Sequence, residues 1–67
     1  MNTEQADIII HALKMIEARS NNLRIFLEEA KDNNELKFAS WYDLKVDIAN
    51  LEDYLQIKIN EAEEVGQ

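Results

Sequence analysis

The sequence predicts an all-α protein, an antiparallel two-helix hairpin with helices at about residues 3–31 and 34–64. Three observations predict this fold. The chain contains no Pro and only one Gly, at position 66, so residues that interrupt helices are almost missing. Two heptad patterns of apolar residues run along it, and a single turn-forming cluster, Asp32–Asn34, separates them. The 67 residues form one helical-hairpin domain at most, with a disordered tail expected at 65–67.

The first predicted helix has one apolar seam along its whole length. Thr3 can cap its start, and Glu4 and Asp7 suit the positive end of the helix dipole. The seam residues then alternate in spacings of three and four: Ala6, Ile9, Leu13, Ile16, Ser20, Leu23, Leu27 and Ala30. Residues 20–22 are Ser, Asn and Asn, which often cap helices, but the seam keeps its phase through them. We therefore predict one continuous helix, and the alternative is two shorter helices that meet at 20–22.

The second predicted helix repeats the pattern after the loop. Its seam consists of Trp41, Leu44, Ile48, Leu51, Leu55, Lys58, Ala62 and Val65. Two starting points are open. A continuous helix from about residue 34 is the simpler one, with Asp32 or Asn34 as the cap. The other begins at Ser40, which forms a capping-box pattern with Asp43, and leaves 36–39 as a separate turn.

The apolar residues exceed what one hairpin can bury, so we expect a homodimer. The seams supply the candidate core or dimer residues, namely Ile9, Leu13, Ile16, Leu23, Leu27, Trp41, Leu44, Ile48, Leu51 and Leu55. Further apolar residues, such as Ile8, Met15 and Ile25, lie off the seams. Burying one such side chain stabilises a fold by about 1.5–3 kcal/mol. Two hairpins in an antiparallel four-helix bundle would bury several of them. The alternative is a monomer with scattered exposed apolar residues.

The charge of the chain disfavours two classes of partner. The formal net charge is -7, and residues 32–67 account for -6 of it. Such a chain is unsuited to nucleic-acid phosphates and to anionic membranes, which both attract Lys and Arg. The chain has no Cys, and its first residues carry acids rather than the basic start of a signal peptide. We expect a cytoplasmic location from these two features.

The sequence contains no catalytic or cofactor motif, and we expect a non-enzyme without cofactor or metal. His11 is the only histidine, and Asp7 lies four residues before it on the same helix face. Two ligands do not make a metal site. Asp43 and Asp47 are also i, i+4 neighbours, a spacing ordinary for solvated charges on a helix.

A second stripe on the second helix is the candidate partner-binding site. It consists of Asp43, Asp47, Asn50, Tyr54, Ile57 and Glu61, and Glu64 continues it. Apolar anchors inside a charged rim are typical of binding surfaces, so this edge is suited to a protein with a basic surface. In the alternative interpretation, Tyr54 and Ile57 pack within the dimer and the acids form its solvated rim.

Three functions follow from these features. The first is a small regulatory or inhibitory protein, of the kind found in phages and mobile elements, that binds a larger protein and mimics nucleic-acid charge. The second rests on a resemblance: in architecture, length and acidity the chain is similar to the plasmid copy-number regulators. That resemblance implies a four-helix-bundle dimer that binds paired RNA, with Lys14, Arg24 and Lys31 as the basic face. The third is a structural adaptor in a larger assembly.

Overall fold

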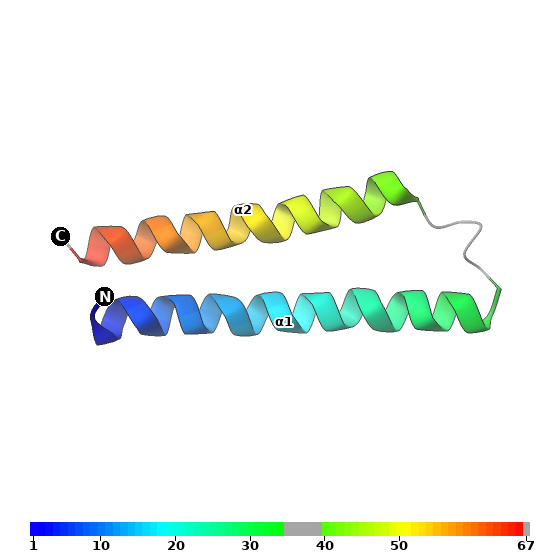
Figure 1. The fold of residues 1–67 in the computed structure, drawn as a ribbon, viewed down its shortest axis with the longest axis horizontal. Helices are drawn as coiled ribbons and strands as arrows, with labels where there is room; N and C mark the ends of the chain where they lie inside the picture. Colours follow the sequence, from blue (N-terminus) through cyan, green and yellow to red (C-terminus); the bar gives the residue numbers. More distant parts are fainter. Residues whose placement is uncertain (35–39, 67) are drawn as a thin grey trace.

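The protein is an antiparallel hairpin of two long helices, as the sequence predicts (Figure 1). The computed structural model describes residues 1–34 and 40–66. Helix α1 spans Thr3–Asp32 and helix α2 spans Trp41–Val65. Both termini lie at one end of the hairpin, where the two ribbons approach each other, and the ribbons separate toward the loop (Figure 1). Neither helix has a stretch long and apolar enough to cross a membrane.

Helix α1 begins at Thr3, as predicted, but its cap is Asn2 rather than Thr3. The Asn2 side-chain oxygen accepts a hydrogen bond from the backbone N–H of Gln5 at 2.8 Å. The Gln5 side-chain oxygen accepts one from the Asn2 N–H at 2.9 Å, which completes a capping box. The helix then continues through 20–22 without a break, so the prediction of one continuous helix is confirmed.

The start of α2 corrects the preferred prediction. Asn34 has a φ of 58°, a left-handed conformation that Asn tolerates better than most residues and that no α-helix contains. Ser40 has an extended backbone, and its hydroxyl accepts hydrogen bonds from the N–H groups of Tyr42 and Asp43, at 3.2 and 3.4 Å. Thus α2 follows the alternative start at Ser40 rather than a start near 34. The separate turn predicted at 36–39 lies outside the described residues.

The end of α2 is also defined by its cap. The helix includes Val65, which was predicted to begin a disordered tail, and the Gly66 N–H donates to the carbonyl oxygens of Ala62 and Glu63, both at 3.2 Å. Residue 67 lies outside the described part of the chain. The helix thus extends one residue beyond its predicted end.

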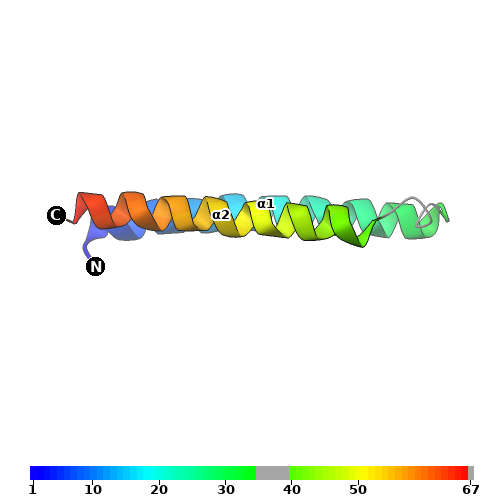
Figure 2. The same cartoon turned by 90° about the horizontal axis from the view of Figure 1, so that it is seen from above.

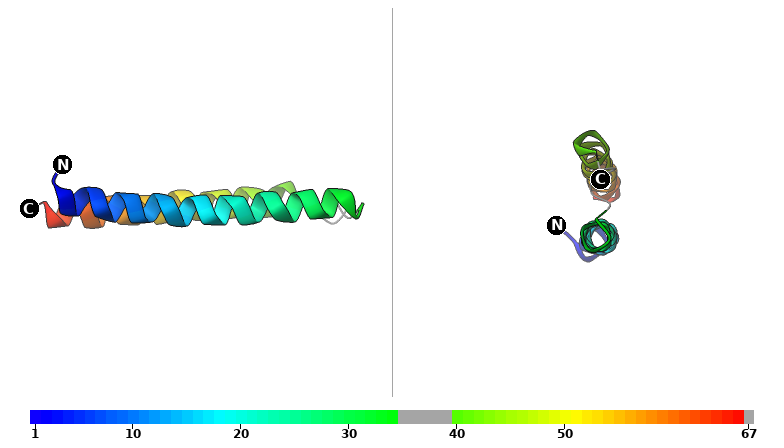
Figure 3. Two further views of the ribbon diagram at one scale, coloured as in Figure 1. Left: turned by 90° about the horizontal axis from the view of Figure 1, so that it is seen from below. Right: turned by 90° about the vertical axis from the view of Figure 1, so that its right-hand side faces the viewer.

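The hairpin is a single layer of helices, and it buries very little. The Cα atoms span 51 × 19 × 9 Å, and the edge-on views in Figure 2 and on the left of Figure 3 show one helix behind the other. The radius of gyration is 15.7 Å, whereas a compact chain of this length would have about 11 Å. Among the described residues, only Ala12, Ala30 and Ala62 are buried apolar residues. A stable domain normally packs two layers around its core, and this chain alone provides one.

The heptad seams are only partly covered, because a seven-residue repeat drifts by about 20° per heptad around a straight helix. In α2 the drift is visible along one stripe: Trp41 is 81% exposed, Ile48 is 45% exposed and Leu55 is half-buried. In α1 the same drift turns Leu13 outward, so that it is 50% exposed. It turns Ala12, which lies off the predicted seam, toward α2, so that Ala12 is 0% exposed. Leu13, Trp41 and Ile48 are therefore not core residues of a single hairpin. The other seven candidates are half-buried between the helices: Ile9, Ile16, Leu23, Leu27, Leu44, Leu51 and Leu55.

Candidate protein-binding surfaces

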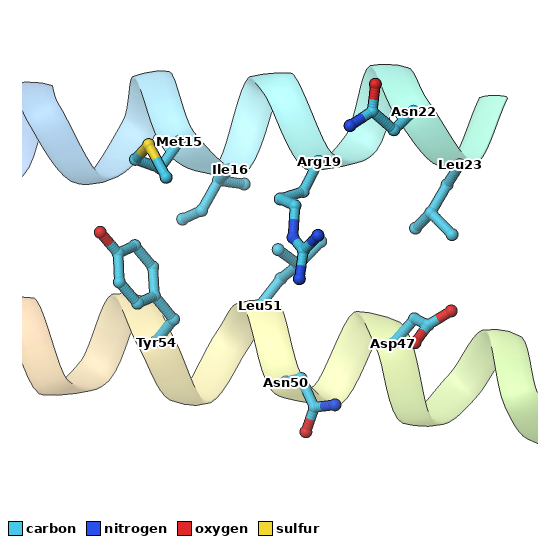
Figure 4. Close-up of a pocket in the computed structure, with 9 residues that line it drawn as sticks. All are labelled: Met15, Ile16, Arg19, Asn22, Leu23, Asp47, Asn50, Leu51 and Tyr54. Carbon is cyan, nitrogen blue, oxygen red and sulfur yellow. The ribbon is translucent and has the colours of Figure 1, made fainter. Parts of the chain in front are cut away.

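One face of the hairpin has a groove between the helices at mid-length, which we call the Tyr54 groove (Figure 4). Its volume is about 560 Å³. The residues that line it are Met15, Ile16, Arg19, Asn22, Leu23, Asp47, Asn50, Leu51 and Tyr54. The two helices separate gradually from the end with the termini toward the loop (Figure 1).

The groove has an apolar floor and polar edges. Ile16, Leu23 and Leu51 lie deepest between the helices, and all three are half-buried. The Tyr54 ring points from α2 toward α1, and the guanidinium of Arg19 extends across the gap from α1 (Figure 4). Among the described residues, ion pairs form between Arg24 and Glu28 and between Lys58 and Glu61, so the charges of Arg19 and Asp47 are both available to a ligand.

The structure brings together only part of the stripe predicted on α2. Asp47, Asn50 and Tyr54 line the groove. Ile57 lies beyond it and is 55% exposed. Asp43 lies at the first turn of α2, where its N–H is bound by Ser40.

The last acid of the stripe, Glu61, is engaged elsewhere. Lys58 Nζ lies 3.2 Å from a Glu61 carboxylate oxygen and 5.6 Å from the centre of the Tyr54 ring. Lys58 therefore neutralises Glu61 and holds a positive charge against Tyr54. The acidic character of the groove edge thus rests mainly on Asp47 and Asp43.

The α1 side of the groove was not predicted. The sequence predicts Met15 only as an apolar residue off the seam, and it predicts no binding role for Arg19 or Asn22. The available signal was their spacing of four and three, which places them on one flank of the seam residues Ile16 and Leu23. Pairing α1 with α2 was needed to show that this flank faces the Tyr54 stripe.

A second groove, the Leu27 groove, lies on the opposite face and has a volume of about 430 Å³. It shares only Leu23 and Leu51 with the Tyr54 groove, since these residues lie between the helices. Its other lining residues are Ser20, Arg24, Leu27, Glu28, Lys31, Leu44 and Ile48. The charged ones all belong to α1 and lie at its outer edge, where Arg24 pairs with Glu28 at 2.8 Å.

The described residues form no metal site beside these grooves, and comparison with known proteins assigns no function to them. His11 is exposed, and no three His, Asp or Glu side chains gather as a metal site in the described ranges. No protein-family model matches the chain, and no curated protein or solved structure matches it. The two grooved faces of the hairpin are therefore its candidate binding surfaces.

Proposed function

We propose that this chain is a small acidic regulatory protein that acts by binding another protein, with the Tyr54 groove as its contact site. The observation that carries the proposal is the combination, in one groove, of an apolar floor, an aromatic anchor and charged groups that form no ion pair within residues 1–34 and 40–66. Tyr is among the residues enriched at binding hot spots, because it combines apolar area with a polar end.

The electrostatics of the edge favour a partner with a basic surface. Asp47 lines the groove and Asp43 lies one turn before it on α2, so a Lys or Arg of the partner can reach a carboxylate there. The net charge of -7 adds long-range attraction for a basic surface. The basic groove of a nucleic-acid-binding protein is one such surface. By occupying that groove in place of the nucleic acid, the chain would inhibit the partner through charge mimicry.

A capture experiment with matched variants tests the proposal. The tagged chain is used to isolate binding proteins from extract of the source cells, beside Tyr54→Ala and Asp47→Asn. Tyr42→Ala and Asp53→Asn serve as controls, because they make the same changes on α2 outside the groove. We expect the partner to be lost with the first two variants and retained with the controls.

The salt dependence of capture tests the charge component. Attraction between exposed charges is screened as ionic strength rises, with a Debye length of about 10 Å at 0.1 M. Capture should therefore weaken steadily as salt is added. Equal loss in the Tyr42 and Tyr54 variants would contradict the groove, and capture that is unaffected by salt would contradict charge mimicry.

A further inference from the structure

The face opposite the Tyr54 groove has an uncharged stripe on each helix, and we call the two together the apolar face. The stripes consist of Ala6, Leu13, Ser20 and Leu27 in α1 and Trp41, Ile48 and Leu55 in α2. Ser20, Leu27 and Ile48 line the Leu27 groove, which fixes the side of the hairpin on which they lie. Residues seven apart stay on the same side of a helix, so the other members follow.

The exposed area of the chain shows how much surface remains to be covered. The hairpin has an accessible surface of 5619 Å². A compact monomer of its mass, 7.8 kDa, would expose about 4,400 Å². The excess of about 1,200 Å² per chain is larger than the roughly 800 Å² that each partner buries in an ordinary specific interface. The excess area of two chains together lies within the range of total area that permanent homodimers bury at their interfaces.

The distribution of charge decides which face a second copy could use. Two chains of net charge -7 repel each other, so their contact must be free of charge at its centre. The Tyr54 groove does not meet this condition, because Arg19 and Asp47 line it. The apolar face does, since the charged residues beside its stripes lie along its outer edges: Glu17, Arg24, Glu28 and Lys31 on α1, and Lys45 and Glu52 on α2.

We propose that the apolar face binds a second copy of this chain, and that two hairpins so joined form a four-helix bundle. The same two stripes on both copies satisfy the requirement of a two-fold interface that one patch is complementary to itself. A second copy also supplies the missing layer of the core, and it is present wherever the chain is made. The two Tyr54 grooves then lie on opposite outer faces of the dimer, and the dimer is bivalent.

Sedimentation velocity and circular dichroism on charge-insertion variants test this proposal. Leu13→Glu and Ile48→Glu place a charge on the apolar face. Phe26→Glu and Val46→Glu place the same charge at exposed apolar positions off that face. We expect the wild type and both controls to sediment as helical dimers at about 10 µM. Both apolar-face variants should weaken association at least about tenfold and sediment as monomers or lose helix content.

A variant that should strengthen the dimer tests the same face even if the charge-insertion variants unfold. Ser20→Leu fills the one polar position in the α1 stripe, and Asn22→Leu adds the same side chain on the Tyr54 side. We expect Ser20→Leu to tighten the dimer at least about tenfold, since two leucines are buried per dimer, and Asn22→Leu to leave it unchanged.

The outcomes separate the two proposals. A wild type that is a stable helical monomer at 100 µM would overturn the dimer, as would a Ser20→Leu variant whose association is unchanged. Loss of association in the Phe26 and Val46 variants would overturn the assignment of the face. Partner capture through Tyr54 is a separate readout, so the failure of either proposal leaves the other to be judged on its own.

Discussion

The side chain of Gln5 joins the two helices at the end where the chain begins and ends. Its Nε2 donates a hydrogen bond to the carbonyl oxygen of Ala62 at 2.9 Å, across 57 positions of sequence. Its Oε1 accepts from the N–H of Asn2 in the capping box of α1. One side chain thus accepts from the backbone at the start of α1 and adds a second donor to the Ala62 carbonyl oxygen, which also accepts from the Gly66 N–H in the last turn of α2. The contact is part-buried and lies beside the buried Ala62.

Two substitutions at Gln5 separate these roles. Gln5→Ala removes both hydrogen bonds and should lower the free energy of unfolding by about 1–2 kcal/mol, since each is worth about 0.5–1.5 kcal/mol. Gln5→Glu keeps the capping acceptor but loses the donor to Ala62. Thermal melts give the stability, and amide hydrogen exchange should show earlier opening of the last turn of α2 in both variants. Asn2→Ala is the control that opens α1 alone, and equal exchange at 62–66 in all three variants would contradict the link.

The cap at Ser40 predicts a second stability change. Its hydroxyl is the acceptor for the first N–H groups of α2, so Ser40→Ala should cost about 1 kcal/mol, and Ser40→Asp should restore most of the loss. The Asp43 carboxylate returns no hydrogen bond to Ser40 among the described residues, so the capping box is half-formed. Asp43→Ala should therefore cost less than Ser40→Ala in a chemical denaturation series. A larger cost for Asp43→Ala would show that the return bond forms in solution.

The sequence was sufficient for the fold because its local signals agree. The absence of Pro, the continuous seam through Ser20 and the capping pattern at Ser40 all describe helices, and each depends on neighbouring residues alone. The start of α2 was uncertain because two caps, near Asn34 and at Ser40, were both chemically suitable. The left-handed conformation of Asn34 decides between them, and no pattern in the sequence specifies that conformation.

The burial of individual seam residues could not be read from the pattern. A strict heptad assumes that the helices coil around each other, whereas these helices are nearly straight, so the contact line moves from one flank to the other. For this reason Ala12 is buried while Leu13 is half exposed. Only the α2 side of the Tyr54 groove was predicted, for a related reason. The α2 stripe is a pattern within one helix, whereas the α1 side of the groove, with Met15, Arg19 and Asn22, depends on the register between the two helices.

Lys58 offers a test of how much a polar residue in the seam costs. Its side chain is 27% exposed, pairs with Glu61 and lies against Tyr54. Exposed pairs of this kind contribute less than about 1 kcal/mol, while the half-buried site would accept an apolar side chain. We expect Lys58→Met to raise the free energy of unfolding by about 1 kcal/mol. Glu61→Gln, which removes only the ion pair, should change it by less than about 0.5 kcal/mol. Destabilisation by Lys58→Met would assign the lysine a structural role.

The arrangement of the bases on α1 predicts that the protein does not bind paired RNA. Lys14 and Arg24 are ten residues apart, which places them nearly three turns from each other along the helix and about 80° apart around its axis, and Arg24 is held by Glu28 at 2.8 Å. RNA binding through a shared basic face needs several cations that reach neighbouring phosphates, and its strength falls with salt. In a gel shift at low ionic strength we expect no complex with a stem-loop RNA, for the wild type or for Glu28→Gln, which frees Arg24. A shift that Arg24→Gln and Lys31→Gln both abolish would contradict this prediction, and it would assign the outer edge of α1 to RNA.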